Sequence, residues 1–152
     1  MDPSINKAPL RTGAAFSLEL DRDLVHVYGE PAFHYFLDIE RARFIRSARP
    51  CVLLRVDLKD QHGIPARLPQ TLSERLFLGI AKSVRDTDFI GWYEDERVAG
   101  VVLTEIAEKQ PDESIRRTVD RMRRRFETLF PVTVSSRLDI RVNTIRDEGV
   151  RN

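Results

Sequence analysis

Apolar residues in the second half of the chain form two short blocks on either side of a polar turn. The blocks are Phe89–Tyr93 and Val98–Leu103, and the turn between them is Glu94–Arg97. This spacing is typical of a β-hairpin. The turn carries four charged residues and no glycine. The pattern therefore predicts a hairpin whose turn is the first place to look for chemistry.

An almost continuous apolar run, Cys51–Val56, ends at Asp57. Such a run is typical of a strand that is covered on both faces, so we expect it in the interior of a sheet. Upstream, Glu30–Arg49 has apolar residues at helical spacing and predicts a helix. Downstream, after a loop that contains two prolines, Thr71–Val84 repeats apolar residues at steps of four and predicts a second helix.

The clearest helical pattern is Pro111–Leu129, which begins with an acidic first turn. Val132–Val142 then alternates apolar and polar residues, which predicts a strand with one solvent-exposed face. Near the start, a broken alternation in Phe16–Val27 predicts a short strand or hairpin, and Met1–Gly13 is expected to have little order. We expect one core from the second and third helices, formed by Leu72, Leu76, Ile80, Ile115, Val119, Met122 and Phe126.

From Cys51 onward the predicted order is strand, helix, strand, strand, helix, strand. This order favours an α+β fold, a ferredoxin-like βαββαβ unit with an additional N-terminal helix and with helices packed on an antiparallel sheet. Right-handed crossovers would place the first strand beside the hairpin, with Asp57 near Glu94. We therefore expect a cluster of carboxylates where the strand ends meet. The expected organisation is a tail with a possible hairpin at residues 1–29, one domain at residues 30–143 and a tail at residues 144–152.

Composition narrows the function classes. The 152 residues suit one domain, and 25 Lys and Arg against 24 Asp and Glu give no long-range attraction to nucleic acid or to an anionic membrane. The single cysteine, Cys51, and the lack of a signal-peptide pattern favour the cytoplasm. His26, His34 and His62 lack the spacing of a zinc site. One helix is notably basic, and we interpret its arginines as a solvated face: Arg116, Arg117, Arg121, Arg123, Arg124 and Arg125.

Four segments resemble the GGDEF domain of diguanylate cyclases. They read FLDIERARFIRSARP, CVLLRVD, RDTDFIGWYEDERVAGVVL and VTVS, and the resemblance spans about Phe33 to Val142. It implies that Asp57 stands where the family has a metal-binding aspartate at the end of the first strand. It also places the family's GG(D/E)EF turn on Glu94, Asp95, Glu96, Arg97 and Val98.

The motif itself departs from the family. Glu94 and Asp95 replace two glycines that let the backbone approach the nucleotide, and Arg97 replaces a metal-binding acid. Lys59 stands where the family has a second aspartate. Because two-metal phosphoryl transfer needs clustered oxygen ligands, we expect no catalytic residue, no metal and no cofactor here.

A second family feature is the RxxD motif that binds cyclic di-GMP, which Arg85 and Asp88 match. The pair allows two interpretations. Arg85 could hold a phosphate of the dinucleotide, or Arg85 could end the helix while Asp88 pins the turn into the hairpin.

These observations predict a catalytically inactive GGDEF-like domain, a regulatory or protein-interaction module of bacterial signalling. Its expected partner is a protein or a second copy of itself, without nucleic acid or membrane. Two alternatives stay open. One is a cyclic di-GMP receptor through Arg85 and Asp88. The other is a nucleotidyl cyclase with an altered motif, built on Asp57, Glu94, Asp95 and Glu96.

Overall fold

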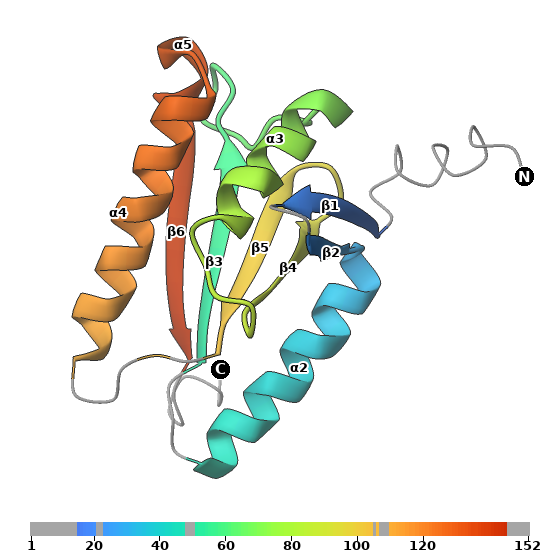
Figure 1. Cartoon of the computed structure of the whole chain (residues 1–152), viewed down its shortest axis with the longest axis vertical. Coiled ribbons are helices and arrows are strands. Elements are labelled where there is room, and N and C mark those ends of the chain that lie inside the picture. Colours follow the sequence, from blue (N-terminus) through green and yellow to red (C-terminus); the bar gives the residue numbers. More distant parts are fainter. Residues whose placement is uncertain (1–14, 21–22, 48–50, 105, 107–109, 146–152) are drawn as a thin grey trace, which may run out of the picture.

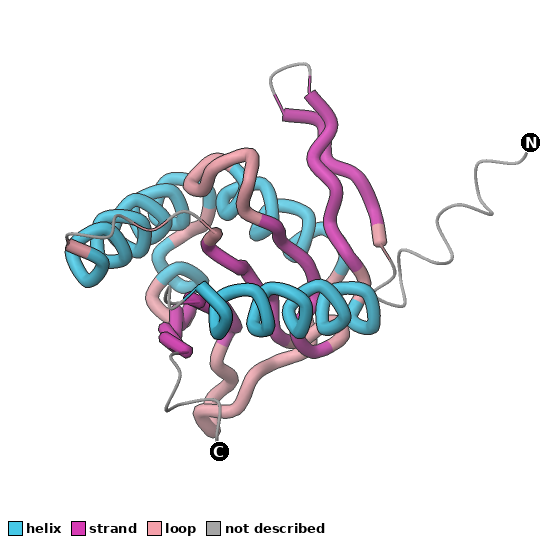
Figure 2. Tube along the Cα trace, turned by 90° about the horizontal axis from the view of Figure 1, so that it is seen from below, coloured by secondary structure: helices cyan, strands magenta, loops and turns pink. Residues whose placement is uncertain are grey.

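The computed structural model describes residues 15–20, 23–47, 51–104, 106 and 110–145. Within them, a six-stranded sheet lies between helices on both of its faces (Figures 1 and 2). The predicted tail at Met1–Gly13 lies outside the described residues. The elements in chain order are β1 Phe16–Leu20, β2 Asp23–Tyr28, α2 Glu30–Ser47, β3 Cys51–Leu58, α3 Gln70–Ala81, β4 Phe89–Glu94, β5 Val98–Leu103, α4 Pro111–Leu129, α5 Val132–Ser135 and β6 Leu138–Ile145.

The strand order is β1-β2-β4-β5-β3-β6. From β4 to β6 all neighbouring strands are antiparallel, which is the predicted ferredoxin-like unit. β3 pairs with β5 on one side and β6 on the other, so the predicted interior strand is confirmed. The sheet as a whole is mixed, because β2 of the N-terminal hairpin joins β4 in parallel.

Two hydrophobic cores lie on opposite faces of the sheet. α3 and α4 cover one face, as expected of the two crossover helices, and the β1–β2 hairpin projects on that side (Figure 2). The predicted core there is confirmed, with Leu72 and Val119 at its partly buried margin. The sequence pattern missed Phe77, which is fully buried in this core against Trp92.

α2 builds the core on the other face through Phe33, Leu37 and Phe44. A Cβ atom on Gly100 of β5 would lie 2.5 Å from Cζ of Phe33. The Phe33 ring can therefore pack on β5 here because residue 100 has no side chain. Burial raises the pKa of the Cys51 thiol to about 11, while Arg41 lowers it and Glu40 raises it by smaller amounts. This thiol therefore packs as a small hydrophobic group and is not a nucleophile at neutral pH.

The predicted strand at Val132–Val142 is wrong in its first part. Residues Val132–Ser135 form the short helix α5, and the strand begins only at Leu138. Pro131 fixes an extended backbone before α5, and its carbonyl accepts the amide of Ser135 at 2.9 Å, which closes a helical turn. The alternation over Val132–Val134 was too short to distinguish a strand from a helical turn. The segment VTVS of the family resemblance therefore lies on a helix.

Among the described residues, none of the helices combines the length and the apolar character that a bilayer crossing needs.

Candidate functional site

The hairpin turn lies where the sequence predicted it, and α2 holds it in place. The amide of Arg97 donates to the carbonyl of Glu94 at 3.0 Å, which closes the turn. The amide of Asp95 donates to Oε1 of Glu30, the first residue of α2, at 2.7 Å. Glu96 has a φ of 60°, a left-handed conformation that costs a non-glycine residue about 1 to 2 kcal/mol. The turn is thus strained and rich in carboxylates.

The side chains of the turn are engaged by the loop after β3. The Arg67 guanidinium pairs with Oε1 of Glu96 at 2.7 Å, and Nη1 of Arg97 donates to the carbonyl of Pro65 at 3.2 Å. Burial raises the pKa of Asp95, and the nearby Glu96 and Glu30 carboxylates raise it further, while Arg67 opposes them. The turn therefore concentrates negative charge, and its arginine points to a protein carbonyl.

Asp57 is fully buried at the turn end of the sheet, where it is the register partner of Val98. Nη2 of Arg141 donates to its Oδ2 at 2.8 Å. Nζ of Lys59 lies 3.0 Å from Oδ1 of Asp57, which makes an ion pair without hydrogen-bond geometry. Both cations also approach Asp139, at 3.6 and 3.8 Å. The protein's own cations thus neutralise the carboxylate of Asp57.

The expected carboxylate cluster is not formed. Across residues 15–145, in the parts that the structure describes, no three His, Cys, Asp or Glu side chains are grouped so as to hold a metal ion. Asp57 faces Arg141 and Lys59, whereas Glu96 faces Arg67. Sequence reasoning missed Arg141, since it stands 84 residues from Asp57 and their contact depends on the pairing of β3 with β6.

A cavity of about 230 Å³ lies beside the turn, between the start of α3 and β1. Arg67 and Glu96 line it as an ion pair, together with Trp92. Trp92 is buried in the core. Its indole N–H has no hydrogen-bond partner among the described residues.

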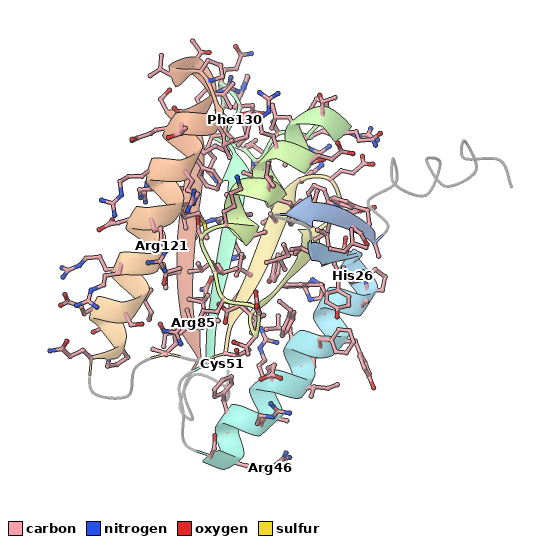
Figure 3. All side chains as sticks on the ribbon, in the orientation of Figure 1. His26, Arg46, Cys51, Arg85, Arg121 and Phe130 are labelled. Carbon is pink, nitrogen blue, oxygen red and sulfur yellow. The ribbon has the colours of Figure 1, made fainter. Side chains whose placement is uncertain are left out.

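Asp88 fastens the loop between α3 and β4. Its Oδ2 accepts the amide of Arg85 at 2.9 Å, and its Oδ1 accepts the amide of Thr104 at 2.8 Å and the hydroxyl at 3.2 Å. These bonds support the interpretation that Asp88 stabilises the turn that leads into the hairpin. Arg85 is exposed and lines, with His26 and Asp88, a groove of about 600 Å³ (Arg85 and His26 are labelled in Figure 3). The ligand interpretation of the pair stays a prediction.

Replacing Asp88 with alanine is expected to lower the free energy of unfolding by about 0.5 to 2 kcal/mol, the scale of a lost cap. The substitution leaves the amides of Arg85 and Thr104 without their acceptor. Urea unfolding measures the change, and Asp86→Ala is the control, since Asp86 is an exposed neighbour in the same groove. Equal stability of the two variants would show that Asp88 does not pin the turn.

No protein-family model matches the chain. A putative adenosine/adenine deaminase from Streptomyces coelicolor is 44% identical over 55 residues, which are 36% of this chain. The matched segment spans only 15% of that deaminase. This similarity is therefore local.

Solved structures give a broader similarity. A DGC protein from Thermotoga maritima is 13% identical with a TM-score of 0.54, over 78% of this chain and 79% of that one. A GGDEF domain from Pseudomonas aeruginosa is 15% identical with a TM-score of 0.56, over 75% and 69%. The diguanylate cyclase SiaD of the same organism, solved with its activator SiaC, is 17% identical with a TM-score of 0.52, over 77% and 46%. The chain has the fold of GGDEF domains.

Proposed function

We propose that this chain is a GGDEF-like domain without cyclase activity, a cytoplasmic module of bacterial signalling that acts through contact with a protein partner or a second copy of itself. The observation that carries the proposal is the neutralised Asp57. Its two carboxylate oxygens are paired with Lys59 and Arg141.

Magnesium would compete poorly at this carboxylate. Mg²⁺ needs oxygen ligands at about 2.0 to 2.1 Å in near-octahedral geometry and is usually held by carboxylates together with substrate phosphates. Here the position of the second family aspartate is Lys59, whose ammonium lies against Oδ1 of Asp57. A metal ion would have to displace Lys59 and Arg141 from Asp57. The two cations thus supply within the fold the positive charge that a metal would bring.

The turn opposes nucleotide binding in a second way. Phosphate groups are favoured by backbone amides and cations, and they are repelled by carboxylates. At this turn the Asp95 amide is already bonded to Glu30, and Arg97 is directed to Pro65. The carboxylates of Glu94 and Asp95 stand where the family has glycines. A triphosphate would therefore meet negative charge and no free cation of the turn.

A role through protein contact has one support among the solved neighbours. SiaD is described as a diguanylate cyclase in complex with its activator, so a chain of this fold can bind a protein regulator. We extend this to the present chain as a proposal. A domain that keeps the fold but has no cyclase activity still offers a surface for contact with a protein.

Calorimetric titration of the purified chain tests the proposal. We expect no GTP binding that depends on Asp57, either with or without magnesium. Micromolar GTP binding that requires magnesium and is lost in Asp57→Asn would contradict it.

A cyclic di-GMP receptor is the second candidate, favoured by the groove that Arg85 and Asp88 line. Cyclic di-GMP in the same titration decides between the two. Micromolar binding to the parent protein, lost in Arg85→Ala, would make the chain a receptor. Because both oxygens of Asp88 already hold backbone amides, we expect no binding.

A further inference from the structure

A basic groove lies between the C-terminal end of α3 and the C-terminal half of α4. It encloses about 320 Å³ and is lined by Lys82, Arg121, Arg124, Arg125, Thr128 and Leu129. Figure 3 labels Arg121 on α4. The groove shares no lining residue with the cavity beside the hairpin turn or with the groove at Arg85. It is therefore a separate feature of the molecule.

Close packing of the two helices builds this basic groove. A Cβ atom on Gly79 of α3 would lie 2.9 Å from Cδ1 of Leu129, so the bare backbone allows α4 to approach. Nε of Arg121 then reaches across and donates to the carbonyl of Ser83 at 3.1 Å, just beyond Lys82. At least one guanidinium of the groove is thus held in position before any ligand arrives.

The cations of the basic groove lack acidic partners. Among the described residues, no carboxylate lies within ion-pair distance of Lys82, Arg121, Arg124 or Arg125, whereas Arg116 and Arg117 on the same helix both pair with Glu113. Like charges three or four residues apart on a helix each cost a few tenths of a kcal/mol. The net charge of the whole chain is only +1, so this accumulation is local.

We propose that the basic groove binds a small ligand with two or more linked phosphate groups. Guanidinium groups bind phosphate oxygens in pairs, and a ligand of charge −3 or −4 would match the four cations. The volume of the groove, about 320 Å³, is close to the lower limit for small-molecule sites, which is about 300 Å³. Leu129 offers a small apolar surface beside the charges. The inference concerns a different surface from the hairpin turn and holds whether or not the chain acts as a cyclase.

Inorganic triphosphate is the probe, titrated calorimetrically without metal at 50 and 200 mM sodium chloride. We expect binding that weakens at higher salt, because the contacts are ionic. Arg124→Gln with Arg125→Gln should weaken it at least tenfold. The matched control is Arg116→Gln with Arg123→Gln, which removes the same charge from the same helix outside the groove, and it should stay within twofold of the parent. ATP in a parallel titration shows whether a nucleoside adds affinity.

Three results would overturn the inference. These are no binding of triphosphate at 50 mM salt, equal weakening in both double variants, and binding of a polyglutamate peptide in place of triphosphate. The last result would indicate an acidic protein partner. Thermal unfolding verifies that the variants are folded. If the groove variant is unstable, Lys82→Gln on α3 replaces it, with an expected loss of at least threefold in affinity.

Discussion

Replacing Phe33 with alanine is expected to lower the free energy of unfolding by about 3 to 5 kcal/mol. The ring is 0% exposed at the centre of the α2 core. It meets Phe89 edge-on, with 5.6 Å between the ring centroids, and lies over the bare backbone of Gly100. Its loss would leave a cavity between the helix and the sheet that neighbouring side chains can fill only in part.

Urea unfolding of Phe33→Ala measures this loss, with Tyr35→Ala as the control on the same helix. Tyr35 is 63% exposed, so its truncation should stay within about 0.5 kcal/mol of the parent. Gly100→Ala should also destabilise the parent, because the new methyl group would overlap the Phe33 ring. The same substitution should destabilise the Phe33→Ala variant less, because the ring is then absent. If Phe33→Ala were as stable as Tyr35→Ala, the described packing of α2 would be wrong.

Removing both cations that face Asp57 should lower the free energy of unfolding nearly as much as Phe33→Ala does. Lys59→Ala with Arg141→Ala leaves a fully buried carboxylate without a partner. We expect a loss of about 3 kcal/mol at pH 7, the lower end for breaking a buried pair, because both cations are themselves partly exposed. Adding Asp57→Leu should recover most of the loss, since the buried charge is then gone.

Arg116→Ala with Arg117→Ala is the control for this charge effect. It removes two cations from exposed pairs with Glu113 and should cost at most about 1 kcal/mol. Chemical unfolding of all three variants and the parent at pH 7 makes the comparison. An Asp57→Leu addition that destabilises the protein further would show that Lys59 and Arg141 do not act by neutralising Asp57.

The fold followed from the sequence wherever a periodic pattern was long. α4 is in place because its helical pattern continues over 19 residues. The β4–β5 hairpin is in place because a polar turn separates two apolar blocks, and Asp57 stands beside β5 because the strand order fixes it. β6 was misplaced at its start, since an alternation of three residues after Pro131 is equally compatible with a helical turn.

The site was less accessible from the sequence. Lys59 could be found because it lies two residues from Asp57, on the same face of the chain. Arg141 could not, because its approach to Asp57 is set by the register of β6 against β3. Asp57 was expected to cluster with the carboxylates of the turn, but Asp57 faces Lys59 and Arg141. Glu96 faces Arg67, which lies on a loop whose path no periodic pattern describes.

Incubation of the purified chain with GTP and magnesium or manganese, followed by chromatography of the products, tests the central proposal most directly. Lys59 and Arg141 pair with the two carboxylate oxygens of Asp57, and the hairpin turn carries Arg97 and no glycine. We therefore expect no cyclic di-GMP and no loss of GTP. Formation of cyclic di-GMP that disappears in Asp57→Asn would contradict the proposal and would make the chain a cyclase with an altered motif.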